Sequence, residues 1–301
     1  MDIALVNAHL DLGAGRRGTD MGPSAIHVAG LVPKLRKLGH TIADIRSFDP
    51  VSHEASQVGD PATRFLDVIL PLCTALADHV EQEVGQGRVP LVLGGDHSVA
   101  IGTIHGLARA MRRQDQRLGV LWIDAHADMN TPGSSPSGNI HGMPLAVLLG
   151  HGESSLCALG QGTPALRPED VAVIGARDID PGEVALIRET GLRVYTMSEI
   201  DARGLNVCLQ EAIERVSLET AGIHLSFDLD GVDPRSAPGV GTPVPGGLGV
   251  RESHLICESV ARTGKLAGLE MVELNPVLDE GNRTGDLAVW LIESAFGKTI
   301  L

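Results

Sequence analysis

The sequence predicts an α/β fold in which parallel strands alternate with helices. Short apolar runs alternate with helical runs along the chain, VPLVL and LGVLWI are continuously apolar, and no repeat or low-complexity linker interrupts the pattern. Such alternation implies parallel strands joined by crossover helices. Continuous apolar runs are typical of central strands covered on both faces. We therefore expect a single domain over residues 1–301.

Eight segments have strand character. In chain order they are Ile3–Asn7, Thr41–Ile45, Val89–Leu93, Leu118–Ile123, Val171–Gly175, Arg193–Tyr195, Gly222–Phe227 and Leu266–Glu273. The helical segments between them include Pro23–Leu38, Ala62–Val84, His97–Met111, Pro181–Glu189, Glu211–Val216, Glu252–Arg262 and Asn282–Ala295. This pattern fits both an open, doubly wound sheet and an eight-stranded barrel, and in both architectures ligands bind at the carboxyl ends of the strands.

The composition argues against several classes of protein. Hydrophobic residues make up 43% of the chain and aromatic residues only 2%, so the core is aliphatic and a platform for stacking bases is absent. A net charge of −14 disfavours nucleic acid as a partner. No run approaches the roughly 18 apolar residues of a membrane span. The N-terminal segment has strand character and no basic region, so we expect a cytoplasmic protein.

Histidine and aspartate side chains gather where three apolar runs end. The candidate metal ligands are His97 in GGDHS, Asp124, His126 and Asp128 in DAHAD, and Asp228 and Asp230 in DLD. A spacing of two residues puts side chains on one face of an extended chain. These two imidazoles and four carboxylates are too many for one ion, and two divalent cations would balance the four negative charges. Donors without thiolate favour ions such as Mn²⁺.

Each motif alone has a simpler interpretation. A D-x-D pair after a strand is often a turn or a helix cap, and GGDHS could be a glycine-rich turn. Asp233, which precedes Pro234, fits a turn and is left out of the ligand set. Together, the three motifs favour a pair of metal ions, which could share one water and hold hydroxide near neutral pH.

The order of these motifs resembles that of the arginase/agmatinase (ureohydrolase) family. GGDHS, DAHADMN and SFDLDGVDP are similar to its three metal-binding signatures, and the likeness continues in RRGTDMGPSAI, SGNIHGMP, GARDIDPGE, GTPVPGG and MVELNP. The resemblance implies a three-layer αβα sandwich with a parallel, doubly wound sheet. It also implies two Mn²⁺ per subunit and a homotrimer or homohexamer.

Within this family, SGNIHGMP resembles the arginases more than the agmatinases. By this resemblance Asn130, Ser137 and Asn139 hold the α-carboxylate of an amino-acid substrate, and Asp180 contacts its α-amino group. The residue types agree, because amides and hydroxyls donate hydrogen bonds to a carboxylate and an aspartate accepts them from an ammonium. Thr242, in GTPVPGG, is assigned to the same substrate site.

The reaction implied by the resemblance is manganese-dependent hydrolysis of L-arginine to L-ornithine and urea. A metal-bridging hydroxide would attack the guanidinium carbon, and Asp128 would pass a proton to the leaving amine. Glu273 would pair with the guanidinium, which stays charged near neutral pH, and His141 would serve as a mobile acid/base.

Several alternatives remain open at this point. A sibling ureohydrolase acting on agmatine, guanidinobutyrate or another guanidino compound would use the same metal site. A two-metal phosphoesterase also uses D-x-H segments, but the chain lacks an arginine cluster for phosphate. A non-catalytic scaffold would be expected to have lost ligands. Asp180 and His141 could instead cap helices, and Glu273 could be a structural ion-pair partner.

Overall fold

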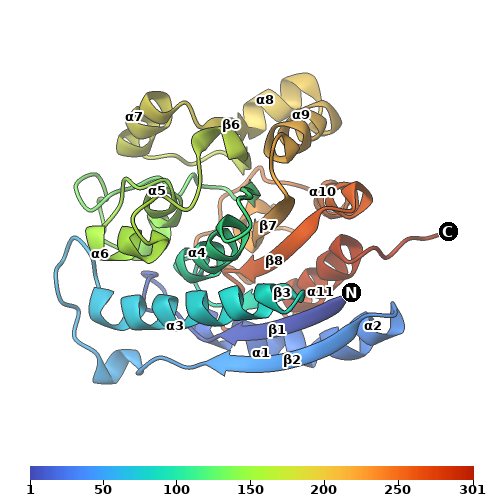
Figure 1. Cartoon of the computed structure of the whole chain (residues 1–301), viewed down its shortest axis with the longest axis horizontal. Coiled ribbons are helices and arrows are strands. Elements are labelled where there is room, and N and C mark those ends of the chain that lie inside the picture. Colours follow the sequence, from blue (N-terminus) through green and yellow to red (C-terminus); the bar gives the residue numbers. More distant parts are fainter.

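A computed structural model describes all 301 residues and contains one eight-stranded sheet with helices on both faces (Figure 1). The strands are β1 (Asp2–Ala8), β2 (Thr41–Phe48), β3 (Val89–Gly94), β4 (Leu118–Ile123), β5 (Val171–Ala176), β6 (Arg193–Thr196), β7 (Gly222–Asp228) and β8 (Leu266–Val272). All neighbours are parallel, in the order β2-β1-β3-β8-β7-β4-β5-β6. Since β2 and β6 are separate edges, the sheet is open, and the barrel alternative is wrong.

Side chains along each strand alternate between two hydrophobic cores. In β1, Ile3 and Leu5 point into one core, whereas Val6 and Ala8 point into the other. The first core is covered by α1 (Gly22–Val28), α2 (Leu31–Lys37), α8 (Met197–Arg203), α9 (Leu205–Ser217), α10 (Val250–Thr263) and α11 (Arg283–Ala295). The second is covered by α3 (Leu66–Gly85), α4 (Val99–Arg112), α5 (Pro144–Leu148), α6 (Ser154–Cys157) and α7 (Pro181–Thr190). These layers confirm the predicted αβα sandwich.

The predicted strands are all present, but some predicted helices are wrong in their extent. The predicted helix Pro23–Leu38 is two helices, because Gly30 between α1 and α2 adopts a left-handed φ of 84°. The predicted helix Glu211–Val216 is only the second half of α9, and α8 has no predicted counterpart. None of the helices combines the length and the apolar character that crossing a membrane requires.

Candidate metal centre and substrate cavity

The candidate ligands converge at the middle of the sheet, where β3, β8, β7 and β4 are consecutive neighbours. Asp228 is the last residue of β7, Asp124 follows β4 directly, and Glu273 follows β8. His97 lies just beyond β3, in the turn that leads into α4. Because all four strands run in the same direction, their carboxyl ends bring these side chains to one edge of the sheet.

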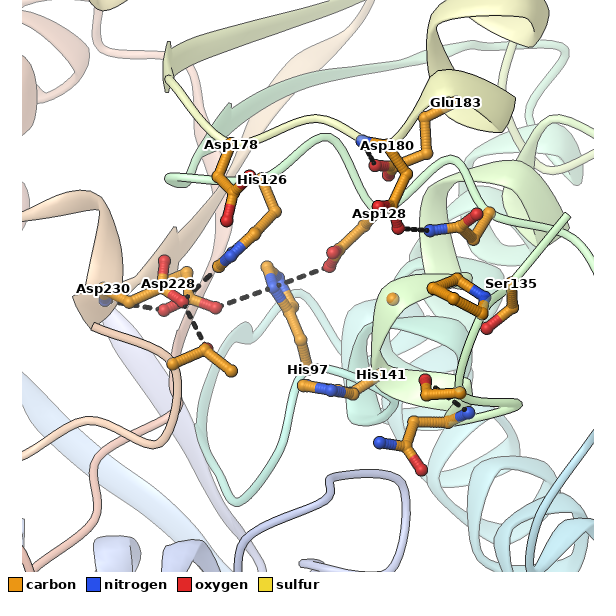
Figure 2. A pocket seen from close by; sticks show the side chains of 16 residues that line it. His97, His126, Asp128, Ser135, His141, Asp178, Asp180, Glu183, Asp228 and Asp230 are labelled. Carbon is orange, nitrogen blue, oxygen red and sulfur yellow. Dashed lines mark hydrogen bonds and ion pairs between the residues drawn. The ribbon is translucent and has the colours of Figure 1, made fainter. Parts of the chain in front are cut away.

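Two groups of ligand atoms form at this edge, each around one imidazole. Figure 2 shows their members except Asp124, which belongs to both groups. The Nδ1 atom of His97 lies 3.2 Å from Asp124 Oδ2, 3.1 Å from Asp128 Oδ2 and 3.2 Å from Asp228 Oδ2. The Nδ1 atom of His126 lies 3.3 Å from Asp124 Oδ1 and 3.2 Å from Asp230 Oδ2. Asp124 therefore offers one oxygen to each group, as a carboxylate that bridges two cations does.

The segments that carry the candidate ligands are turns, so the extended backbone assumed for DAHAD is wrong. Asp124 Oδ1 accepts a hydrogen bond of 2.7 Å from the backbone N–H of His126, and Asp228 Oδ1 accepts one of 2.7 Å from Asp230. Such Asx turns fold the chain over the strand end. The same aspartates can form a turn and also bind a cation, because Oδ1 of Asp124 and Asp228 accepts the turn hydrogen bond while Oδ2 lies close to His97.

The chemistry of these residues fits divalent cations. His97 Nδ1 and Asp128 Oδ2 are buried without a hydrogen-bond partner. Burial and the charge of Asp124 raise the pKa of Asp128 to about 6, and burial and Asp230 raise the pKa of Asp228 well above its usual value. Cations would supply the missing positive charge and return both groups to the carboxylate form. Imidazole and carboxylate donors without thiolate suit manganese and similar ions.

A chain of polar side chains behind His97 fixes the orientation of its ring. Its Nε2 donates to Ser226 Oγ over 2.9 Å, and Ser226 donates in turn to Glu270 Oε1 over 2.7 Å. Nδ1 is thereby left as the nitrogen that can bind a cation. On the other side, the ring stacks on Trp122 with centroids 4.1 Å apart, and Trp122 Nε1 donates to Asp124 Oδ2 over 2.9 Å.

These supporting residues were not among the predicted site residues, although the sequence contains a signal for them. Ser226 and Trp122 each precede an aspartate ligand by two positions on a strand, and Glu270 precedes the end of β8 by two. Residues two apart on a strand share one face. Polar side chains in this register of buried strands are therefore candidates for ligand support. His224, treated as an ordinary core residue, lies 3.4 Å from Glu270.

A cavity of about 160 Å³ opens above the two ligand groups, and none of its sixteen lining residues is hydrophobic. Its walls include every residue assigned to the substrate except Glu273, namely Asn130, Ser137, Asn139, Asp180 and Thr242, together with His141. The metal-ligand candidates at its floor are His97, His126, Asp128, Asp228 and Asp230. A small cavity lined mostly by polar and charged side chains suits a small, highly charged molecule.

The cavity wall is held by hydrogen bonds between segments that are distant in sequence. Asn130 Nδ2 donates to Asp180 Oδ2 over 2.9 Å, and Thr242 Oγ1 donates to Asp230 Oδ2 over 2.8 Å. Asp180 is also the residue at the N-cap of α7, so the cap interpretation and the cavity position coincide. Ser137 is exposed at the rim, and its Oγ accepts from the backbone N–H of Asn139 over 3.2 Å.

Glu273 lies behind His141 and does not line the cavity. Its Oε1 accepts from His141 Nδ1 over 3.1 Å and from the backbone N–H of His97 over 2.9 Å, and only 1% of the residue is exposed. Burial lowers the pKa of His141, but the hydrogen bond and charge of Glu273 outweigh burial and raise it to about 9. The assigned pairing of Glu273 with a substrate guanidinium therefore stays a prediction, whereas its pairing with His141 is direct.

The backbone of Gly95 packs closely against two other segments, at Glu273 and at Leu10. The backbone N–H of Glu273 donates to the carbonyl of Gly95 over 2.8 Å, and Glu273 itself adopts a left-handed φ of 64°. A Cβ added to Gly95 would lie 1.7 Å from the carbonyl oxygen of Leu10. Only glycine lets β3 turn into the metal-binding segment at this position.

Two further acidic residues of the cavity, Asp178 and Glu183, were missed by the sequence analysis. Glu183 accepts hydrogen bonds from the backbone N–H groups of Met129 and Asp180, over 2.9 and 2.8 Å. Burial raises the pKa of Glu183 to about 7. Its place three residues after the N-cap of α7 is the sequence signature of a capping box, which explains its structural role but gives no signal for the cavity.

The fold and the site together define an α/β protein with an acidic, two-histidine candidate metal centre at the carboxyl edge of an open parallel sheet. The chain matches the model of the Arginase family over residues 1–297. It is 47% identical to the arginase of Bacillus caldovelox, over 99% of both chains. The crystal structure of Bacillus cereus arginase superposes with a TM-score of 0.94 at 45% identity, covering 100% of both chains.

A more distant solved structure is that of Entamoeba histolytica arginase in complex with L-ornithine. It is 31% identical to this chain, with a TM-score of 0.89 and 99% of both chains covered. The chain belongs to the arginase family, and it is therefore an enzyme of the hydrolase class.

Proposed function

We propose that this enzyme hydrolyses L-arginine to L-ornithine and urea, acting as one catalytic domain over residues 1–301. The observation that carries the proposal is the pair of ligand groups sharing Asp124 at the floor of a cavity without hydrophobic lining residues. Relatives named arginase at 47% and 48% identity over nearly the whole chain support the activity. The complex of the Entamoeba relative with L-ornithine supports the proposed product.

The proposed cofactor is a pair of Mn²⁺ ions. One would be held by His97, Asp124, Asp128 and Asp228, and the other by His126, Asp124 and Asp230. Bound there, two divalent cations lower the pKa of a shared water, so that hydroxide is available near neutral pH. The remaining steps depend on side chains that hold the substrate and move protons.

Asp128 is proposed to carry the central proton transfer. Its carboxylate faces both His97 and the cavity, and it can accept the proton of the attacking water and deliver it to the amine that leaves the guanidinium carbon. His141 lies in the cavity wall and can return protons from solvent between turnovers. Glu273 holds His141 through their 3.1 Å contact, and it is proposed to pair with the substrate guanidinium as the family resemblance implies.

The head group of the substrate is proposed to bind at the opposite wall. The amide and hydroxyl groups of Asn130, Ser137 and Asn139 can donate to the α-carboxylate, and Asp180 can accept from the α-amino group. Thr242 positions the ligand Asp230 through its 2.8 Å hydrogen bond and faces the cavity. The distance between this wall and the ligand groups would then select substrates by length as well as by charge.

A panel of three substrates tests the proposal. Urea release from L-arginine, agmatine and 4-guanidinobutyrate is measured with the Mn²⁺-loaded enzyme. We expect a strong preference for L-arginine, because agmatine lacks the carboxylate and 4-guanidinobutyrate lacks the amino group. A preference for either analogue would keep the metal chemistry and favour the sibling ureohydrolase instead.

Two variants separate the head-group contacts. Asp180→Asn should lower kcat/KM for L-arginine by about ten- to a hundredfold, since it weakens a hydrogen bond to a charged group, and should leave 4-guanidinobutyrate unaffected. Asn139→Ala should lower kcat/KM for L-arginine and leave kcat/KM for agmatine unchanged, because agmatine has no carboxylate. Asparagine is also a good N-cap residue, so the first variant keeps the start of α7 intact. Equal losses on all substrates would contradict these assignments.

The expected homotrimer or homohexamer also remains part of the proposal. Sedimentation velocity with the Mn²⁺-loaded enzyme distinguishes these assemblies from a monomer. Metal analysis of enzyme purified without added metal identifies the native ion and its number per chain. Sedimentation as a monomer, or the absence of manganese, would overturn the corresponding part.

A further inference from the structure

A third group of potential metal ligands lies at the β2 edge of the sheet, away from the cavity. Asp44 comes from the edge strand β2, and His79 and Glu83 lie one turn apart on α3, which runs alongside the strands near this edge (Figure 1). One ligand atom of each residue lies within 4.8 Å of the others. None of these residues lines the substrate cavity.

His79 carries the argument, because its ring nitrogen is buried without a partner. Only 8% of the residue is exposed, and its Nε2 has no hydrogen bond. The carboxylate oxygen Oδ2 of Asp44 is 3.6 Å from this nitrogen, beyond hydrogen-bond distance. Burial lowers the pKa of His79, so the ring is in the neutral form that binds metal ions.

The separation of these two atoms fits a shared cation. Bonds of about 2.0 Å at tetrahedral angles put neighbouring ligand atoms about 3.3 Å apart. The 3.6 Å between His79 Nε2 and Asp44 Oδ2 is close to that value. An ion between them would therefore satisfy the buried nitrogen with little movement of either side chain.

Glu83 supplies a second carboxylate, and basic residues limit the negative charge. Its Oε2 accepts from Arg88 Nη1 over 2.6 Å, which leaves Oε1 for another partner, and only 3% of the residue is exposed. The positive charge of Arg46, two positions after Asp44 on β2, also lowers the pKa of His79. The charges of Arg46 and Arg88 offset part of the negative charge of the two carboxylates. Because one of the three donors is an imidazole nitrogen, the site favours an ion that binds nitrogen well over Ca²⁺ or Mg²⁺.

We propose that Asp44, His79 and Glu83 form a third cation site that takes one divalent first-row transition ion, with zinc preferred. Imidazole nitrogen and carboxylate oxygen both bind zinc, and water can fill the fourth position on the side where Asp44 is 39% exposed. The ion fastens the edge strand β2 to α3. An edge strand pairs on one side only, so a tie of this kind limits its fraying and its pairing with other chains.

Counting the metal ions bound to wild type and variants tests the site. The Mn²⁺-loaded enzyme is freed of unbound metal, incubated with Zn²⁺ and again freed of unbound metal. The total of bound manganese and zinc per chain is then measured by mass spectrometry. We expect the wild type to gain about one equivalent, and Asp44→Asn and His79→Gln to gain none. Zinc that merely replaces manganese leaves the total unchanged.

Asp49→Asn is the matched control, because Asp49 follows the same strand, is 71% exposed and lies 3.9 Å from a histidine, His9. It should gain the equivalent as the wild type does. Zn²⁺ should also raise the Tm of the wild type and not that of Asp44→Asn. The latter variant changes a partly exposed side chain and keeps the measurement readable if His79→Gln fails to fold. No gain in the wild type, or the same gain in Asp44→Asn, would overturn the proposal.

Discussion

Asp128 and Glu273 both combine a left-handed backbone with a buried carboxylate. Their φ angles are 52° and 64°, in the left-handed region that residues other than glycine, asparagine and aspartate rarely adopt. The carbonyl of Asp128 accepts from the backbone N–H groups of Leu145 and Ala146, and the N–H of Glu273 donates to Gly95. These long-range hydrogen bonds hold a costly conformation at the two positions where we place proton transfer and its support.

Asp128→Asn tests the role of this residue in turnover. Asparagine keeps the size and tolerates the left-handed backbone, but cannot accept a proton. We expect kcat to fall by about 10²- to 10⁴-fold with a much smaller change in KM. Metal content per chain is measured alongside, because Asp128 is also a proposed ligand. Nearly normal turnover in a fully loaded variant would remove the proposed proton role.

At the scale of elements, the segment from Met129 to Gly142 shows how a loop becomes a rigid wall. Its Gly138 adopts a φ of 71°, and a Cβ added there would lie 1.7 Å from the carbonyl oxygen of Pro61. The carbonyl of Gly138 accepts from the backbone N–H of Arg64. Packing against the segment that leads into α3 therefore fixes the loop, which carries Ser137 and Asn139 on either side of this glycine.

Gly138→Ala should disturb substrate binding by shifting this wall. The left-handed backbone alone costs a residue with a side chain about 1–2 kcal/mol, so we expect KM for L-arginine to rise about tenfold while the metal content stays unchanged. Gly133→Ala, in the same loop, is the control, because its nearest neighbour would be 3.8 Å away. Equal effects of the two variants on KM would contradict the argument.

At the scale of the whole molecule, metal ions and folding should be coupled. The ligands come from three strand ends that are far apart in the sequence, so the site exists only in the native state. An ion at 100 times its Kd stabilises such a state by about 2.7 kcal/mol. We expect chelation to lower the Tm and re-addition of Mn²⁺ to restore it. An unchanged Tm in verified metal-free protein would argue against a preformed site.

The size of this metal effect should depend on pH. Burial and Asp124 raise the pKa of Asp128 to about 6, whereas an unfolded aspartate titrates near 3.9. The metal-free native state therefore binds more protons than the unfolded state between about pH 4 and about pH 6, and its stability falls as the pH rises through this range. The Tm difference between loaded and metal-free enzyme should widen from about pH 5 to about pH 7.5. A constant difference would contradict this.

The sequence by itself determined the eight strands, most of the helices and the six ligand candidates. Apolar runs specify strands through local side-chain pattern, and the D-x-H-x-D and D-x-D motifs follow two of these runs directly. Where the local pattern is weaker the prediction failed, as at Gly30 and in α8. The Asx turns at Asp124 and Asp228 also depend on local geometry, yet they were read as extended chain.

The tertiary structure alone decided which strands are neighbours, and with them the layout of the site. Because β8 and β7 lie between β3 and β4, Glu273, Ser226 and Glu270 come close to His97. Because α7 packs beside the cavity, Asp178 and Glu183 become part of the cavity wall. It likewise decided that the sheet is open. Strand order and helix packing arise from surfaces that are distant in the chain, and no local sequence pattern records which of them will meet.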